Sequence, residues 1–210
     1  MGMSIKLLIE QLSDKLNDDQ RELLNAADEE QQRLRSLVDD LLDLSKIEAG
    51  KMQMEFQDVA VNSLFQRAQK VMVSQAEEKG IRFEVNTPSE KIIVKADPSK
   101  IIWVLTNLIG NALRYTDSGG TIRLNAGIYS RIVYLSVEDT GAGIPPEHQA
   151  KIFDKFVQVK NERSTGGTGL GLEICREIVR AHGGTIWVDS EPGKGSKFTF
   201  TIPSAYLNKE

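Results

Sequence analysis

Residues 166–171 read GGTGLG, and helix-forming sequence follows them at once. Glycine-dense backbone in front of a helix is typical of phosphate sites, because exposed N–H groups and the helix dipole both favour an anion. The run is not a Walker A motif, because no Lys-Ser or Lys-Thr follows its second glycine, and it lacks the G-x-G-x-x-G spacing of dinucleotide-binding folds. We therefore expect a glycine-rich flap that leads into a helix N-terminus.

A second group of polar residues lies in the segment TNLIGNALRYT. Asn107, Asn111 and Arg114 are spaced by four and three residues, so on a helix they share one face. An amide oxygen can bind Mg²⁺ and a guanidinium can bind phosphate. The alternative for this stretch is a solvated polar face without a ligand.

The segment VEDTGAGIPP ends a predicted strand with an acid and then turns through two glycines. Asp139 could accept a hydrogen bond from an exocyclic amine such as that of adenine, and Gly141 and Gly143 would let the backbone approach the ring. Alternatively, Asp139 only caps the turn, because turns of this composition are common.

Composition narrows the class of protein. A net charge of −4 and a pI near 5.4 exclude a broad basic field for nucleic acid, so any anion site is local. No apolar stretch approaches the ~20 residues of a membrane span. The single cysteine, Cys175, is expected to pack as a small hydrophobe in a reducing compartment.

Residues 1–51 show a purely helical pattern, with apolar stripes at 5–16 and 34–44. Asn17 and Gln20 resemble a capping box between the two helices, and Gly50 is placed to end the second. We expect an antiparallel hairpin that dimerises into a four-helix bundle. The alternative is a hairpin that packs on its own downstream domain. Because the helical pattern begins almost at the first residue, we expect the chain to be part of a longer protein.

Residues 52–210 alternate between strands and helices. Strands are expected near 51–56, 81–86 and 91–96, as two strands joined by a turn near Ser130, and over 185–191 and 196–203. Helices are expected at 62–80, from Pro98, and from about Gly169 to His182. This order predicts an α+β fold, a two-layer sandwich in which helices cover one face of a mixed sheet.

Four segments in order, NLIGNALRYT, DTGAGI, FDKFVQV and GGTGLGL, resemble the N, G1, F and G2 boxes of sensor histidine kinases. The segment DLLDLSKIEAGKM resembles the end of their second dimerisation helix, and GSKFTFTIP resembles their last strand. The resemblance covers essentially the whole chain. It implies a Bergerat fold, ATP and Mg²⁺ as cofactors, a homodimer formed through the hairpin, and a response-regulator receiver domain as partner.

The resemblance also implies residue roles. Asn111 matches the amide that holds Mg²⁺ against the ATP phosphates, Asp139 matches the carboxylate that reads the adenine amino group, and Phe153 and Phe156 match the anchors of the ATP lid. The implied catalytic residues are Asn107 and Arg114, the implied metal ligand is Asn111, and the implied nucleotide contacts are Asn107, Asn111, Arg114, Tyr115, Asp139, Gly141, Gly143, Ile144, Lys155, Gly167, Thr168, Gly169, Leu170, Gly171 and Thr199.

The chain departs from the family pattern in two places. Gln158 stands where many relatives carry Arg, so the lid cation is expected at Lys155, Lys160 or Arg163. Asn107 stands where the chaperone, gyrase and MutL-type ATPases of this superfamily place a glutamate base. An amide cannot take a proton from water, which argues against dedicated ATP hydrolysis.

The family transfers phosphate from ATP to a histidine on the first dimerisation helix, but the two histidines here, His148 and His182, lie outside the hairpin. We expect residues 1–51 to be a shortened hairpin without the phosphoacceptor and residues 52–210 to be the ATP-binding domain. The chain should bind Mg·ATP without phosphorylating itself, and the parent protein should pass phosphate to a response-regulator aspartate. The alternatives are a nucleotide-binding regulatory module and an energy-coupled ATPase. We expect a cytoplasmic location, with any membrane attachment through upstream segments.

Overall fold

The computed structural model of the chain describes residues 16–158 and 168–205, beginning with the long helix α2 (Asp18–Glu48). The predicted capping box is present: the Asn17 side chain accepts from the backbone N–H of Gln20, and the Gln20 side chain accepts from that of Asn17. Gly50, with φ of +62°, follows the helix as predicted. The first arm of the expected hairpin lies outside the described residues.

A mixed five-stranded sheet forms one layer of the domain that follows α2, in the order β2-β4-β5-β7-β6. Its strands are β2 (Arg82–Asn86), β4 (Thr121–Tyr129), β5 (Ile132–Asp139), β6 (Ile186–Glu191) and β7 (Gly195–Pro203). Only the β2–β4 pair is parallel among these neighbours. The β4–β5 hairpin turns at Ser130 and Arg131, both with positive φ, as a two-residue turn requires.

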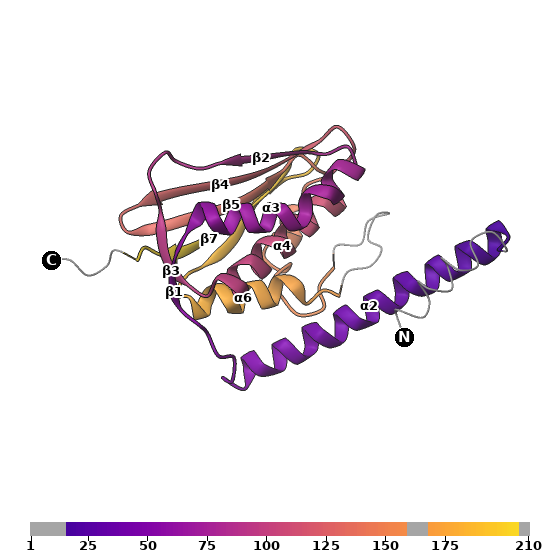
Figure 1. Cartoon of the computed structure of the whole chain (residues 1–210), viewed down its shortest axis with the longest axis horizontal. Helices are drawn as coiled ribbons and strands as arrows, with labels where there is room; N and C mark the ends of the chain where they lie inside the picture. Colours follow the sequence, from indigo (N-terminus) through magenta and orange to yellow (C-terminus); the bar gives the residue numbers. More distant parts are fainter. Residues whose placement is uncertain (1–15, 159–167, 206–210) are drawn as a thin grey trace.

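Three helices cover one face of this sheet, which confirms the predicted two-layer architecture (Figure 1). They are α3 (Val61–Glu78), α4 (Pro98–Tyr115) and α6 (Gly171–Ala181), while the short α5 (Pro146–Gln149) lies near β6. The core between the layers is apolar and includes Phe65, Leu105 and Phe200, each fully buried. In the part of the chain that the structure describes, no helix has the length and apolar character to cross a membrane.

A second, two-stranded sheet was not predicted. β1 (Gln57–Ala60) pairs antiparallel with β3 (Ile93–Ala96). The strand expected at 51–56 is wrong, because this segment runs as an extended connection and the strand begins only at Gln57. The backbone N–H of Glu55 donates to the Asp97 carboxylate (3.0 Å) instead of to a neighbouring strand, which fixes the connection without a ladder.

The start of α4 is fixed by Asp97 and Pro98. The Asp97 carboxylate accepts from the backbone N–H groups of Ser99 (2.9 Å) and Lys100 (3.2 Å), and Pro98 occupies the first turn. This cap positions the whole of α4, which carries the polar stripe predicted from the sequence.

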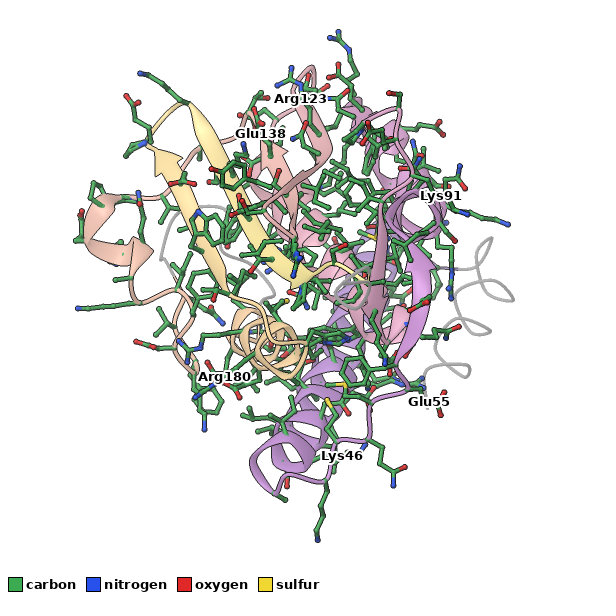
Figure 2. All side chains as sticks on the ribbon, turned by 90° about the vertical axis from the view of Figure 1, so that its left-hand side faces the viewer. Lys46, Glu55, Lys91, Arg123, Glu138 and Arg180 are labelled. Carbon is green, nitrogen blue, oxygen red and sulfur yellow. The ribbon has the colours of Figure 1, made fainter. Side chains whose placement is uncertain are left out.

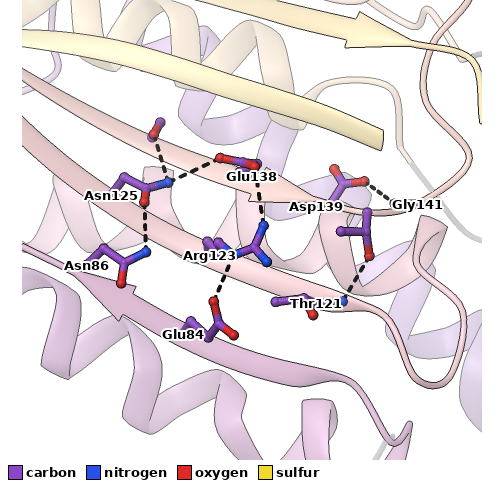
Figure 3. A network of polar contacts seen from close by, with 10 residues as sticks. Glu84, Asn86, Thr121, Arg123, Asn125, Glu138, Asp139 and Gly141 are labelled. Atoms are coloured by element: carbon purple, nitrogen blue, oxygen red, sulfur yellow. Dashed lines mark hydrogen bonds and ion pairs between the residues drawn. The ribbon is translucent and has the colours of Figure 1, made fainter. Parts of the chain in front are cut away.

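On the face of the sheet turned away from the helices, a network of polar side chains joins β2, β4 and β5. Arg123 donates to Glu84 (2.7 Å) and pairs with Glu138 (3.4 Å), while Asn125 accepts from Asn86 (3.1 Å) across β2, β4 and β5 (Figure 3). These side chains alternate with the buried residues of the same strands, as a half-buried sheet requires.

Helix α2 lies against α6 at its C-terminal half, while its N-terminal half extends away from the domain (Figure 1). Leu44 is buried in the domain core, whereas Leu34, Val38 and Leu41 are exposed on another part of the helix. Charged side chains at the rim, such as Lys46 on α2 and Arg180 on α6, point to solvent (Figure 2). The helix therefore has one face in contact with the domain and an apolar stripe without a partner among the described residues.

Candidate functional site

A pocket of about 380 Å³ opens between α4, α6 and the ends of β5 and β7. Asn107, Asn111 and Arg114 all line it, so the predicted stripe of α4 faces a cavity and not open solvent. Leu108, Ile109 and Ala112 of the same helix are buried in the core, as their positions predicted. Of the residues named from the sequence, Tyr115, Asp139, Gly143, Ile144, Thr168, Gly169 and Gly171 also line the pocket.

One end of the pocket holds the buried carboxylate of Asp139, which is 6% exposed. Burial raises the pKa of this group, and hydrogen bonds from the backbone N–H groups of Gly141 (2.8 Å; Figure 3) and of Ser196 oppose that rise. No cation of the described residues is among the causes of the shift, and Asp139 lines the pocket with its carboxyl group unpaired to any positive charge there. A neutral donor such as an exocyclic amine is the ligand chemistry that suits it.

Gly141 and Gly143 serve packing at this end of the pocket. A Cβ on Gly141 would lie 2.3 Å from the carbonyl oxygen of Tyr115, and a Cβ on Gly143 would lie 2.1 Å from that of Glu191. Gly141 does not line the pocket, so its predicted role as a direct neighbour of a base is not supported by its placement. It acts through its N–H on Asp139 and through the close contact with the end of α4.

The other end of the pocket is the N-terminus of α6. A Cβ on Gly171 would lie 2.6 Å from Oδ1 of Asn107, so only glycine lets the Asn107 amide lie over the first turn of this helix. The N-cap residue Leu170 makes no side-chain cap, and its side chain is fully buried in the core and does not line the pocket. The N–H groups of a first helical turn have no partner within the helix, and together with the helix dipole they favour an anion here.

Phe153 and Phe156, which follow α5 in the sequence, each contact a segment that lines the pocket. Phe153 is buried and packs edge-to-face on Phe198 (6.3 Å between centroids), which fits its predicted role as an anchor. Phe156 was predicted as the second anchor of the lid, but its side chain is 63% exposed. Its backbone N–H donates to the carbonyl of Gly169 (2.9 Å), and its φ of +62° turns the chain.

Two further predictions change with the structure. Thr199 was expected near the base, but it does not line the pocket. It follows Phe198 on β7, and because side chains alternate along a strand, its side chain points to the opposite face of the sheet. Ser196 and Phe198 line the pocket in its place. Lys155 is exposed and does not line the pocket. Burial raises the pKa of the Glu173 carboxyl, and the charges of Arg176 and Lys155 only oppose that rise.

Three residues suggested as phosphate contacts or lid cations, Lys160, Arg163 and Gly167, lie outside the described residues. Gln158, the position at which a cation was missing, lines the pocket. Among the residues 16–158 and 168–205, no group of three or more His, Cys, Asp or Glu side chains could hold a metal ion. A metal at this site would therefore depend on amide oxygens, on its ligand and on water.

Helix α2 also contributes to the pocket, which no pattern in the sequence predicted. Ser36 and Asp40 line it, and Oδ2 of Asp40 accepts a hydrogen bond from Oγ1 of Thr168 at 2.7 Å. Burial raises the pKa of Asp40, while the Thr168 hydrogen bond lowers it. Asp40 and Thr168 are 128 residues apart, and no spacing rule relates them.

Both histidines lie away from the pocket. His182 is buried, its Nδ1 lies 2.7 Å from the carbonyl of Ile178, and its Nε2 accepts from the backbone N–H of Asp97 (3.0 Å). This confirms the structural role predicted for a histidine at the end of α6. His148 lies on the short α5, and it too is absent from α2. Cys175 is fully buried, as predicted, and burial raises the pKa of its thiol.

Comparison with known proteins agrees with this geometry. The family model described as "Histidine kinase-, DNA gyrase B-, and HSP90-like ATPase" matches residues 96–206, and that of the "His Kinase A (phospho-acceptor) domain" matches residues 3–50. The alginate biosynthesis sensor protein KinB of Pseudomonas aeruginosa is 37% identical over 97% of this chain and 34% of its own length. The sensor histidine kinase WalK of Bacillus subtilis is 39% identical over 83% of this chain and 29% of its own. The chain thus spans about a third of these relatives.

Solved structures share the fold of this chain. Full-length ShkA in complex with AMPPNP superposes with a TM-score of 0.79 at 33% identity, covering 99% of this chain and 43% of that one. The histidine kinase ThkA in complex with the response regulator protein TrrA gives a TM-score of 0.74 at 28% identity, covering 98% of this chain and 58% of that one.

Proposed function

Because the chain belongs to the histidine kinase-, DNA gyrase B- and HSP90-like ATPase family and comprises the catalytic and dimerisation region of a sensor histidine kinase, we propose that its pocket binds Mg·ATP as a phosphoryl donor. One observation carries the proposal. The α4 stripe connects a buried acceptor, Asp139, with an anion-favouring helix start at Gly171. A nucleotide has the same polarity, with an amine-bearing base at one end and phosphates at the other.

In this proposal, residues 52–210 form the ATP-binding domain and residues 1–51 the hairpin. Asp139 accepts a hydrogen bond from the adenine amino group, with Ile144 and Gly143 beside the base. Arg114 and Tyr115 contact the phosphates and the ribose. The Asn111 amide oxygen holds Mg²⁺, which needs only one or two protein ligands when phosphates and water supply the others. Bound Mg²⁺ would neutralise charge on the phosphates during transfer.

We propose phosphoryl transfer, and not ATP hydrolysis, as the reaction of the parent protein. The residue at the start of the stripe, Asn107, has an amide, which cannot act as a general base for water. Its contact with the backbone of Gly171 positions it beside the phosphate end. The acceptor in the parent would be a histidine of the hairpin, followed by an aspartate of a response regulator. A purely regulatory nucleotide-binding module remains the second candidate.

The proposed partners follow from the exposed surface of α2 and from the relatives. The apolar stripe of Leu34, Val38 and Leu41 needs a partner, and a second copy of the hairpin supplies one in a four-helix bundle. The complex of ThkA with a response regulator supports a receiver domain as the second partner. With a net charge of −4, nucleic acid is not proposed as a partner. The use of ATP places the proposed reaction in the cytoplasm.

Calorimetry with Mg·ATP tests the proposal. Wild type should bind Mg·ATP, and Asp139→Asn should lose most of the affinity and the preference for ATP over GTP, because the amide presents donors as well as an acceptor to the base. Asp58→Asn on the exposed strand β1 is the matched control and should bind as wild type does. Absence of heat with the wild-type protein would overturn the proposed function.

A further inference from the structure

The carboxylate of Asp40 lies at the end of the pocket that favours anions. Its Oδ2 accepts from Oγ1 of Thr168 (2.7 Å), and the same Oγ1 accepts from the backbone N–H of Leu170 (3.2 Å). Leu170 is the N-cap of α6, and no side chain of its own caps that helix. The docked helix α2 thus supplies an anion, through Thr168, to the helix N-terminus that the proposed function assigns to phosphate.

The position of Asp40 along the pocket follows from α4. At the base end, the carbonyl of Tyr115 accepts from the backbone N–H of Ala142, close to Asp139. At the other end, the Asn107 amide lies against Gly171. Tyr115 follows Asn107 by eight positions along the helix, a rise of about 12 Å. Asp40 contacts Thr168 next to the N-terminus of α6, so it lies at the end of the pocket where Asn107 meets Gly171.

The charges of the pocket make this placement consequential. Among the described residues that line it, the carboxylates are Asp40 and Asp139 and the cation is Arg114. Asp139 is used at the base end, so Asp40 adds negative charge where the phosphates would lie. A carboxylate and a phosphate close together repel each other, and burial strengthens the repulsion because it lowers the local dielectric constant.

We infer that Asp40 competes with the phosphate farthest from the base for the N-terminus of α6, so that the docked arrangement of α2 favours ADP and the binding of ATP favours release of α2. This inference rests on the proposed function, because it requires a nucleotide in the pocket. It deepens that function by assigning nucleotide discrimination to a residue outside the ATP-binding domain. Linkage makes the coupling reciprocal: whatever undocks α2 also raises the affinity for ATP.

Removing the charge of Asp40 tests the inference. Asp40→Asn keeps the shape and an acceptor for Thr168 but removes the repulsion, so the affinity for Mg·ATP should rise about 5- to 10-fold relative to that for Mg·ADP, a usual size for coupling between two sites. Asp39→Asn is the matched control: Asp39 is the exposed neighbour on the same helix, and its removal changes net charge equally. For each variant, calorimetry measures the dissociation constants of Mg·ATP and Mg·ADP, and the readout is the first divided by the second.

The outcomes separate the inference from the proposed function. A ratio that falls in Asp40→Asn and stays at the wild-type value in Asp39→Asn supports the inference. An unchanged ratio in Asp40→Asn, or a loss of ATP affinity, would overturn it, since Asp40 would then be neutral or would help to hold the nucleotide. Failure of wild type to bind either nucleotide would instead overturn the proposed function.

A tryptophan reports on α2 directly. Trp103 of α4 lines the pocket with Ser36 and Asp40, and the second of the two tryptophans, Trp187, lies on β6 and can be replaced by Phe. In the Trp187→Phe background, Mg·ATP should shift the emission of Trp103 to longer wavelength as α2 leaves and solvent enters, and Mg·ADP should not. Equal spectra with both nucleotides would contradict the release of α2.

Discussion

The ring nitrogen Nε2 of His182 accepts a hydrogen bond from the backbone N–H of Asp97 at 3.0 Å, and so joins the end of α6 to the start of α4. The other ring nitrogen lies 2.7 Å from the carbonyl of Ile178, so the neutral imidazole donates at Nδ1 and accepts at Nε2. The ring of Phe56 packs edge-to-face on the imidazole at 5.1 Å between centroids. The two helices that line the pocket, α4 and α6, are therefore joined to each other by residues that lie outside the pocket.

Acid should weaken this connection. Burial lowers the pKa of His182 below its ordinary value of about 6.5, so in acid the unfolded chain binds a proton more readily than the native protein does. The contribution to stability is present above about pH 6.5 and is lost as the pH falls toward the native pKa, because a protonated Nε2 cannot accept from Asp97. Urea unfolding between pH 8 and 5 measures the loss.

The histidines provide their own control for this prediction. His182→Gln should cost about 1–3 kcal/mol at pH 8 through unpaired buried groups, and it should flatten the pH dependence above pH 5. His148→Gln on α5 should keep the wild-type pH dependence. A steep wild-type-like curve in His182→Gln would show that another group titrates.

Asp97 fixes both α4 and the connection that arrives from α2. Burial alone would raise its pKa, but hydrogen bonds from Ser99, Glu55 and Lys100 together hold the pKa below the ordinary value. Its contribution to stability is therefore present above the ordinary pKa and is lost as the pH falls toward the native one. Asp97→Ala should lower the free energy of unfolding by about 2 kcal/mol at pH 7, as expected for a lost N-cap, and Asp58→Ala should leave it within about 0.5 kcal/mol.

The buried carboxylate of Asp139 should lower stability in the absence of nucleotide. Because burial raises its pKa, stability falls as the pH rises from the ordinary value to the native pKa, so this group lowers stability at pH 7. Asp139→Asn should raise the free energy of unfolding by about 1 kcal/mol, a size common when a functional site is relieved, while it loses ATP affinity. A variant that is both less stable and unable to bind ATP would show that Asp139 acts only as a structural residue.

The local patterns of the sequence predict much of the fold and of the α4 side of the pocket. Helical periodicity is enough to bring Asn107, Asn111 and Arg114 to one face, because three or four residues make one turn. Caps at Asn17 and Asp97 are equally local, since the side chain reaches its own next turn.

Pairings between distant segments could not be predicted. Phe198 and Thr199 are neighbours in the sequence and face opposite sides of the sheet. Which of them faces the pocket depends on the register that pairs Ser196 with Asp139. The contact of Asp40 with Thr168 depends on how α2 lies against α6, a packing of two helices far apart in the sequence. The segment 51–56 alternates like a strand. Its backbone N–H at Glu55 donates to the side chain of Asp97, 42 residues further on, and not to a neighbouring strand.

The 210-residue chain should not phosphorylate itself. Of its two histidines, His182 is buried with both ring nitrogens engaged, and His148 lies on α5, not on α2. Incubation with γ-labelled Mg·ATP should leave no acid-labile, base-stable phosphate on the protein. Robust labelling that disappears in His148→Gln would contradict this expectation and identify a different acceptor.

Glycine at position 171 should matter for nucleotide binding more than for folding. A Cβ there would lie 2.6 Å from Oδ1 and 2.8 Å from Nδ2 of Asn107, and that side chain can rotate away more cheaply than the backbone can move. Gly171→Ala should therefore change the melting temperature by only a few degrees, since alanine favours a helix, yet reduce Mg·ATP affinity about tenfold by displacing the Asn107 amide. Gly127→Ala on β4, where a Cβ meets nothing within 4 Å, is the control and should bind ATP as wild type does. Wild-type affinity in Gly171→Ala would mean that the Asn107 amide does not need its observed place over α6, and that the phosphate end of the proposed site is wrongly drawn.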